Sequence, residues 1–158
     1  MPEPMQSSRH AATSILVIGD DAPRCRAFLE DGLPGRRAFL AIDDDDVDAI
    51  AAKLSAHAFE RILLIASRPD TPTLTEDAII AQQQRGIVQV MRIARALDGL
   101  GEAQRDLQWD LVTVNALPAT AESRVEPTHA GLQGLTGSMA EAYPGWRLRM
   151  LDVPDLSA

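Results

Sequence analysis

Acid–base chemistry that uses a lysine beside a tyrosine would depend on the one tyrosine and the one lysine of this chain. They are Tyr143 and Lys53, and the remaining positive charges belong to 14 arginines. A mechanism that needs a lysine beside a tyrosine must bring together residues 90 positions apart in the sequence. No local motif of this chain provides that pair.

The stretch Ile15–Asp21 (ILVIGDD) could place a ligand at the end of a strand. A dinucleotide site needs closely spaced glycines so that the backbone can approach a pyrophosphate. After Gly19, however, two aspartates follow and the next glycine is Gly32. The carboxylates of Asp20 and Asp21 would point near the phosphates of a bound dinucleotide, and Pro23 has no backbone N–H to donate to them. The sequence therefore argues against a cofactor at this turn.

A magnesium site of the receiver type could use Asp20 and Asp21, because hard oxygen ligands suit Mg²⁺. That kind of domain also needs an aspartate at the end of its third strand and a lysine after its fifth. The nearest aspartate, Asp70, lies beyond a proline, and no lysine follows Lys53. We interpret ILVIGDD as a strand that ends at a capped helix.

Other polar clusters have structural interpretations. Asp43–Asp46 lacks the ligand spacing of a calcium loop and suits the start of a helix through the helix dipole. The three histidines are scattered, and we expect His129 to lie at the surface or to cap a helix. Because no G-x-S-x-G motif occurs, Ser138 is interpreted as a packing position. We expect no catalytic, cofactor-binding or metal-binding residue.

The segment GLQGLTG places Gly131, Gly134 and Gly137 in a predicted helix. Its spacing does not fit a phosphate loop. Each glycine weakens a helix by about 1 kcal/mol relative to alanine. We therefore expect the glycine side of this helix to lie very close to the sheet or to a neighbouring helix.

The composition is that of a soluble globular domain. The chain has 158 residues, of which 46% are hydrophobic and 24% charged, with a net charge of −8. This charge would repel nucleic acids and anionic membranes, and no run is long enough for a signal core or a membrane span. A single cysteine, Cys25, excludes an internal disulfide. We expect a cytosolic protein with a lead-in over 1–13 and one domain over 14–158.

Apolar strand-type runs alternate with helical patterns, which predicts a parallel sheet with helices on both faces. A shortened Rossmann arrangement with strand order 3-2-1-4-5 is expected, and this α/β fold forms one domain. The predicted strands are Ile15–Ile18, Arg37–Ile42, Arg61–Ala66, Asp110–Asn115 and Arg147–Val153; the predicted helices are Ala22–Glu30, Val47–Ala56, Glu76–Leu100 and Pro127–Tyr143.

The long helix is predicted from a capping box and an apolar stripe. Thr73 and Glu76 have the spacing of that box. One face of the helix is marked by Ile80, Ile87, Met91, Ala94 and Leu97. We expect these side chains to share one face of the helix.

The carboxy-terminal third resembles the structural subdomain of modular polyketide synthase ketoreductases, most closely those of trans-acyltransferase assembly lines. The resemblance lies in LQWDLVTVNALPA and HAGLQGLTGSMAEAYPGWRLRMLDV. Its motif residues are Gly131-Leu132-Gln133-Gly134-Leu135, Glu141, Tyr143-Pro144, Trp146 and Asp152. The segment AIIAQQQRGIVQVMRIARAL is similar to the preceding helix, so the resemblance covers about residues 15–153.

The resemblance implies a truncated Rossmann half, related to short-chain dehydrogenases, that binds no NADPH and supports a catalytic half. Such dehydrogenases need Tyr and Lys four residues apart on one helix, which Tyr143 and Lys53 cannot provide. The catalytic half is absent, and the chain ends at Ala158 without the strands that normally follow Asp152. It is therefore expected to be either an excised piece or a natural truncated domain.

Three functions follow from this reading. The first is a non-catalytic scaffold that binds a catalytic ketoreductase half, neighbouring synthase domains or a second copy, with LRMLDV as an edge strand that must be covered. The second is a small enzyme or ligand binder with a site near Gly19, Asp20 and Asn115. The third is a docking module for an acyl carrier protein, through a patch formed by Arg92 and Arg95.

Overall fold

A single parallel sheet of five strands organises the protein. The computed structural model describes residues 13–20, 35–43, 45–66, 75–118 and 127–154. The strands are β1 (Ser14–Gly19), β2 (Arg36–Ala41), β3 (Arg61–Ile65), β4 (Leu107–Val114) and β5 (Trp146–Val153), and every adjacent pair is parallel. The predicted five-stranded, parallel Rossmann-like sheet is confirmed. The predicted lead-in and the helix Ala22–Glu30 lie outside the described residues.

The strand order is 2-1-3-4-5, so the predicted order 3-2-1-4-5 is wrong. β3 pairs with β1 on the side opposite to β2. The reason is visible in the burial of the strands: β3 is buried on both faces, whereas β2 begins with the exposed residues Arg36 and Arg37. A strand that is apolar after its first residue belongs in the interior of a parallel sheet, and a strand with two exposed arginines suits its edge.

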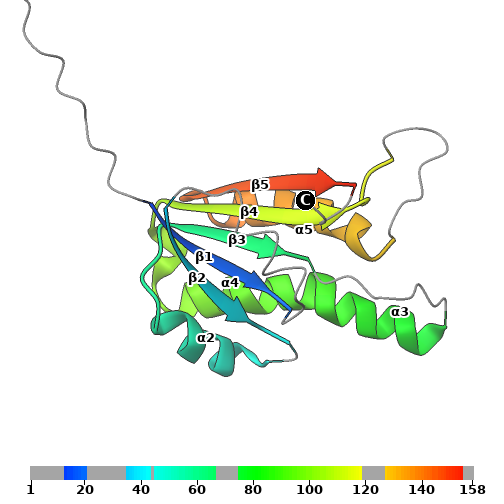
Figure 1. Cartoon of the computed structure of the whole chain (residues 1–158), viewed down its shortest axis with the longest axis horizontal. Coiled ribbons are helices and arrows are strands. Elements are labelled where there is room, and N and C mark those ends of the chain that lie inside the picture. Colours follow the sequence, from blue (N-terminus) through cyan, green and yellow to red (C-terminus); the bar gives the residue numbers. More distant parts are fainter. Residues whose placement is uncertain (1–12, 21–34, 44, 67–74, 119–126, 155–158) are drawn as a thin grey trace, which may run out of the picture.

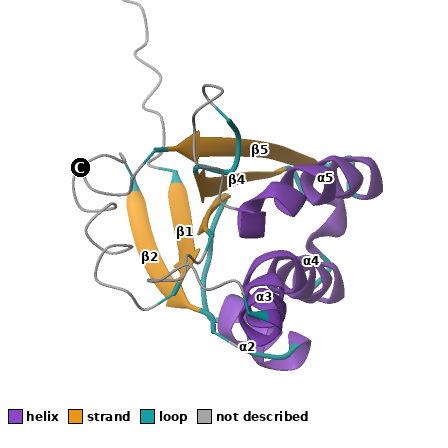
Figure 2. Ribbon diagram, turned by 90° about the vertical axis from the view of Figure 1, so that its right-hand side faces the viewer, coloured by secondary structure: helices purple, strands orange, loops and turns teal. Residues whose placement is uncertain are grey.

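The described helices all lie on one face of the sheet (Figure 2). They are α2 (Val47–Ser55), α3 (Glu76–Gln83), the π-helical turn η1 (Gln84–Val88), α4 (Gln89–Gly99), the short 3₁₀ turn η2 (Glu102–Gln104) and α5 (Pro127–Ala142). The predicted helices at Val47, Glu76 and Pro127 are confirmed. The prediction of helices on both faces depended on residues 22–30, which are not described.

The long helix is interrupted by a π turn, and this changes which side chains reach the core. Gly86, Val90, Ile93 and Leu97 face the sheet and are buried. A π turn adds a residue to one turn, so the segments before and after it do not share one continuous stripe. Ile80 and Met91 were predicted on one face with Ala94 and Leu97, but they are 51% and 47% exposed whereas Ala94 and Leu97 are buried. In addition, α3 projects beyond the ends of the strands and has no buried residue (Figure 1).

Two helix caps bear on the sequence predictions. The Asp46 carboxylate accepts from the Ala49 backbone N–H at 2.8 Å, which confirms the aspartate run as a helix start. At α3 the cap is Thr75, whose hydroxyl accepts from the Ala78 N–H at 3.3 Å. The predicted capping residue Thr73 is therefore wrong, and it lies outside the described residues.

The glycines of α5 behave differently from one another. Gly131 lies against the Ile87 side chain so closely that a Cβ at this position would collide with it, as predicted. Gly134 and Gly137 have open space where a Cβ would lie, so the predicted close packing is wrong for these two. Ser138 is also exposed rather than packed, and its hydroxyl donates to the Gly134 carbonyl at 3.2 Å.

The main core lies between the sheet and the described helices. Its side chains come from alternate positions of the strands, such as Leu16 and Ile18 of β1 and Ile62 and Leu64 of β3. At the amino-terminal ends of β4 and β5, Trp109 and Trp146 lie with ring centroids 5.4 Å apart. β4 begins at Leu107, three residues before the predicted start, because its first residues also pair with β5.

Candidate functional site

A hollow opens at the carboxyl ends of β1 and β3, where the strand order reverses: β2 lies beside β1 on one side, and β4 lies beside β3 on the other. In open α/β sheets this switch point is the usual place for a ligand. The hollow has an empty volume of about 330 Å³, which includes open solvent. Its walls are mostly apolar and come from β1, β3, η1 and α5: Ile18, Gly19, Leu64, Ala66, Gly86 and Leu132 are among them.

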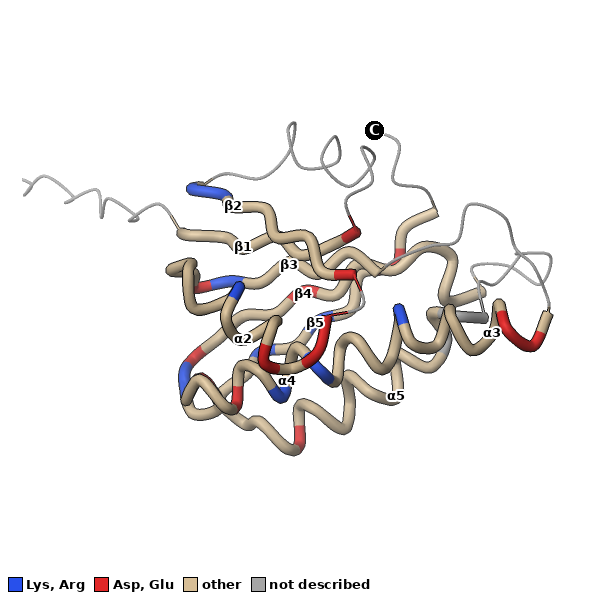
Figure 3. The backbone as a smooth tube through the Cα atoms, turned by 90° about the horizontal axis from the view of Figure 1, so that it is seen from below, with Lys and Arg blue, Asp and Glu red and all other residues tan. Residues whose placement is uncertain are grey.

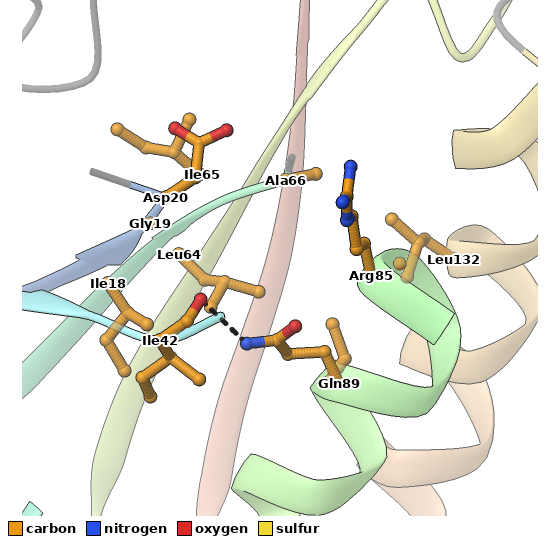
Figure 4. Close-up of a pocket in the computed structure, with 12 residues that line it drawn as sticks. Ile18, Gly19, Asp20, Ile42, Leu64, Ile65, Ala66, Arg85, Gln89 and Leu132 are labelled. Carbon is orange, nitrogen blue, oxygen red and sulfur yellow. Dashed lines mark hydrogen bonds between the residues drawn. The ribbon is translucent and has the colours of Figure 1, made fainter. Parts of the chain in front are cut away.

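Three polar side chains line this hollow (Figure 4). Asp20 extends from the end of β1, and Arg85 extends from η1 on the other side. Gln89 is buried and donates to the Ile42 carbonyl at 2.9 Å, which ties α4 to the end of β2. The hollow therefore presents one carboxylate and one guanidinium in apolar surroundings. Of the predicted positions, Gly19 and Asp20 lie here, but Asn115 does not line the hollow.

A second polar cluster lies at the carboxyl ends of β4 and β5 and is built around Asp152. One carboxylate oxygen accepts from the Thr113 hydroxyl and from the Ala116 N–H, both at 2.8 Å. The other oxygen accepts from the Leu117 N–H at 3.0 Å. Asn115 has a positive φ of 50° and its side chain donates to the Pro154 carbonyl at 3.1 Å. Asp152 thus fixes the turn after β4.

His129 belongs to the same region and corrects the sequence prediction. It is fully buried rather than exposed, and its Nδ1 accepts from the Val114 backbone N–H at 3.2 Å. His129 thus provides an acceptor for a buried backbone N–H at the end of strand β4, and it does not cap the end of a helix. Because this nitrogen acts as an acceptor and the side chain is buried, the contact is a structural one between α5 and β4.

The environment of Asp152 lowers its pKa. Partial burial alone would raise the pKa, but the hydrogen bonds from Ala116, Leu117 and Thr113 outweigh it. A lowered pKa means that folding stabilises the carboxylate. This contribution is present above the ordinary aspartate pKa of about 3.9 and is lost as the pH falls through the folded-state value.

We expect Asp152→Asn to lower the free energy of unfolding at pH 7 by about 1–3 kcal/mol, because three donors lose a charged acceptor. The difference from the unsubstituted protein should shrink as the pH falls below about 4, first because the aspartate of the unfolded chain becomes protonated and then, at lower pH, because the folded carboxylate does. Urea titrations between pH 3 and 7 would measure it. Asp106→Asn, in an exposed ion pair with Arg147, is the control and should change stability little at any pH. A deficit independent of pH would contradict this prediction.

Tyr143 and Lys53 lie far apart in the fold. The Tyr143 ring stacks on Trp146 at 4.0 Å, beside the amino-terminal end of β5. The Lys53 ammonium binds the Asp45 carboxylate at 2.7 Å and the Ala41 carbonyl at 3.2 Å, at the carboxyl end of β2. β2 and β5 are the two opposite edges of a parallel sheet. The two side chains are therefore at opposite edges and opposite ends of the sheet, and neither can act on the other.

One charged group was missed by the sequence analysis. Asp110 is fully buried in β4, and its carboxylate accepts from Arg61 at 2.5 Å and from Arg149 at 2.7 Å. The hydrogen bond that the Arg149 guanidinium donates to Asp110 also raises the pKa of Arg149. A lone aspartate within an apolar strand, with arginines in both neighbouring strands, is the sequence signal that would have indicated this group. Because it lies at the amino-terminal half of the sheet, away from the hollow, we interpret it as structural.

The predicted arginine patch for a carrier protein is only partly available. Arg95 is exposed, but Arg92 is half-buried and donates to the Asp45 carbonyl at 3.3 Å. The acidic start of α2 lies beside α4, so acidic and basic residues are close together in this part of the chain (Figure 3). Among the described residues, no group of three acidic, histidine or cysteine side chains could hold a metal ion.

The chain is homologous to stretches of polyketide synthases. It is 36% identical over 110 residues to the synthase PksM and 29% identical over 140 residues to PksN, both of Bacillus subtilis (strain 168). It is 30% identical over 147 residues to ThaG of Burkholderia thailandensis. These alignments cover 69%, 88% and 90% of the chain, which spans about 2% of the length of each synthase. No family model matches the chain.

Solved structures with the same fold are short-chain dehydrogenases and related enzymes. A short-chain dehydrogenase family protein from Francisella tularensis aligns with a TM-score of 0.63 at 12% identity, over 89% of this chain and 68% of the other. A short-chain oxidoreductase from Pseudomonas aeruginosa described as containing an atypical catalytic centre gives 0.62 at 16% identity, over 88% and 68%. At these identities the likeness establishes the Rossmann-like fold alone. No helix in the described part of the chain has the length and apolarity to cross a membrane.

Proposed function

We propose that this chain is the non-catalytic, structural half of a ketoreductase region in a polyketide synthase. Homology to polyketide synthases gives the context, and the Rossmann-like fold matches that of short-chain dehydrogenases. The observation that carries the proposal is the separation of Tyr143 from Lys53 across the sheet. Reduction of a ketone in this fold needs both groups at one place, and no second copy of either residue exists in the sequence.

The hollow at the switch point supports the same proposal. A nicotinamide dinucleotide would place its pyrophosphate at the end of β1, where backbone N–H groups and glycines normally hold it. Here the half-buried Asp20 follows Gly19 directly, and a carboxylate at that place repels phosphate. The fold thus keeps the shape of a cofactor-binding half, with a carboxylate at the place where the pyrophosphate would lie.

The surface that would meet a catalytic half is the edge formed by β5. In the described part of the chain, β5 pairs with β4 alone, as the predicted edge strand LRMLDV should. Leu151 on this strand is 42% exposed, and its neighbours Arg147 and Arg149 are exposed as well. An uncovered edge strand readily pairs with another chain. We infer that the catalytic half, or an adjoining synthase domain, covers this edge.

A second candidate is a small-ligand binder, which the hollow favours through its apolar walls and the side chain of Arg85. It predicts saturable binding of a nucleotide or another small anion. The carrier-protein alternative is less favoured, because Arg92 is engaged with Asp45 and α2 adds negative charge nearby.

The test combines a cofactor titration with a binding experiment. We expect the isolated chain to show no saturable NADPH binding by calorimetry and no reduction of a β-ketoacyl thioester. Co-expressed with the catalytic half of a polyketide synthase ketoreductase, it should co-purify with that half and increase its soluble yield and activity. Leu151→Asp should weaken the complex about tenfold or more. Ile79→Asp, similarly exposed at 45% but on α3 and not on β5, should not.

Two results would overturn the proposed function. Reduction of the thioester by the isolated chain with NADPH would show that it is an enzyme in its own right. Tight NADPH binding without reduction would favour the ligand-binding candidate. In either case the affinity of the chain for a catalytic half should also be measured, because binding to that half does not depend on whether the chain binds NADPH.

A further inference from the structure

The edge strand β5 carries two arginines on the face of the sheet opposite to the described helices. Leu148 and Met150 of this strand pack against the core beneath those helices (Figure 2). Because side chains alternate between the two faces of a strand, Arg147 and Arg149 point to the opposite face, where both are exposed. Leu151 follows on that face and is 42% exposed. The outer side of β5 thus presents two positive charges and then an apolar side chain.

A buried carboxylate holds one of these arginines beside an arginine of another strand. Asp110 in β4 accepts from Nε of Arg149 at 2.7 Å and from Nε of Arg61, in β3, at 2.5 Å. Each guanidinium uses only its Nε in this contact, and no described residue accepts from the terminal amino groups of either. Two guanidinium groups around one carboxylate leave an excess of one positive charge. Their terminal amino groups remain as donors for a second anion.

Arg147 extends this positive surface along the strand. Its ion-pair partner is Asp106, with 3.0 Å between nitrogen and oxygen. The two side chains are 68% and 75% exposed, so the pair is weak and another carboxylate can replace Asp106. The net charge of the whole chain is −8. A basic surface on β5 is therefore a local property that runs against the charge of the protein as a whole.

The backbone of β5 offers pairing positions beside these side chains. The carbonyls of Gly145 and Val153 accept from β4 at 3.3 and 3.0 Å. Since the backbone groups of successive residues point to opposite sides of a strand, the residues offset from these by one, such as Leu148, turn their N–H and C=O away from β4. A strand added there would lie about 4.8 Å from β5, and its alternate side chains would lie beside the exposed arginines.

We propose that β5 binds an extended acidic segment of a partner protein. The segment adds a strand to the sheet, with carboxylates beside Arg147 and Arg149 and an apolar side chain beside Leu151. Charge selects this occupant, because a second copy of the chain, paired through its own β5 in an antiparallel homodimer, would bring like charges together. The inference rests on the proposed function for the identity of the partner: it names the chemistry by which a catalytic half or a neighbouring synthase domain covers this edge.

The test uses the full chain and two fluorescently labelled peptides. One has glutamates at its first and third positions, leucine at its fifth and valines between, and the other has lysines in place of the glutamates. We expect the acidic peptide to bind about tenfold more tightly, measured by fluorescence anisotropy. The net charge of −8 acting alone would give the opposite order. Equal binding of the two peptides, or tighter binding of the basic one, would overturn the proposal.

A matched pair of charge reversals locates the site. Arg147→Glu should weaken binding of the acidic peptide about fivefold or more, because one attraction becomes a repulsion. Arg95→Glu makes the same change of charge at an exposed position of α4, in the helix layer, and should leave the affinity unchanged. Circular dichroism should show that both variants stay folded, since both side chains are exposed. An equal loss in the two variants, or no loss in either, would contradict a site on β5.

The same variants separate this inference from the proposed function. If the chain binds a catalytic half and Arg147→Glu weakens that complex, both are supported. If the complex is insensitive to Arg147→Glu, the acidic-strand proposal is overturned and the scaffold role stands. Selective binding of the acidic peptide without any binding of a catalytic half would support the site on β5 and count against the proposed function.

Discussion

Trp109→Ala is expected to lower the free energy of unfolding by about 3–5 kcal/mol. The Trp109 side chain is 1% exposed, and its ring lies 5.4 Å from that of Trp146 where β4 and β5 begin. Removing it leaves a large cavity between the sheet and the helix layer, and the surrounding rings cannot fill it. Because domains of this kind are stable by only about 5–15 kcal/mol, urea denaturation should show a clearly earlier midpoint.

Trp146→Phe is the matched control for this prediction. It keeps an aromatic ring beside Tyr143 and Trp109 but removes the hydrogen bond from Nε1 to the Glu102 carbonyl at 2.9 Å. The expected loss is about 1 kcal/mol, and Trp109 remains as the single fluorescent indole. A loss below about 1.5 kcal/mol for Trp109→Ala would mean that this corner of the core is not tightly packed.

Arg61→Ala is expected to lower the free energy of unfolding by about 3 kcal/mol. Asp110 has no exposed surface, and Arg61, whose side chain is 23% exposed, is the more buried of its two cationic partners. Without it the buried carboxylate keeps only Arg149 and the Gln108 amide, at 3.2 Å, as hydrogen-bond donors among the described residues. An incompletely paired buried charge is strongly destabilising. Chemical denaturation at pH 7 measures the loss.

Two comparisons show whether burial is the cause of this effect. Arg149→Ala removes the other partner, which is 55% exposed, and should cost less because water can replace it. Arg147→Ala breaks an ion pair whose side chains are 68% and 75% exposed and should have almost no effect. Equal losses in all three variants would contradict the assignment of Asp110 as a buried structural anion.

The candidate site could be anticipated in part. The sequence indicated that the end of the first strand offers carboxylates instead of a glycine-rich phosphate loop, and the structure brings Asp20 to a hollow at that place. It did not indicate Arg85, because the π turn that carries this side chain has no clear sequence signature. It also misjudged His129, since one histidine near a helix start is equally compatible with a surface cap and with a buried acceptor.

By itself, the sequence determined the alternation of strands and helices and the parallel α/β class. It also determined that Tyr143 and Lys53 cannot form a local pair, because residue types and their spacing along the chain set these properties directly. Only the tertiary structure decided the strand order, the exposure of Ile80 and Met91, and the pairing of Asp110 with Arg61 and Arg149. These features depend on which elements lie side by side. The burial of whole strands determines which strands are neighbours, and the one extra residue of the π turn determines which helix residues are exposed. Neither property can be recognised in a short stretch of the sequence.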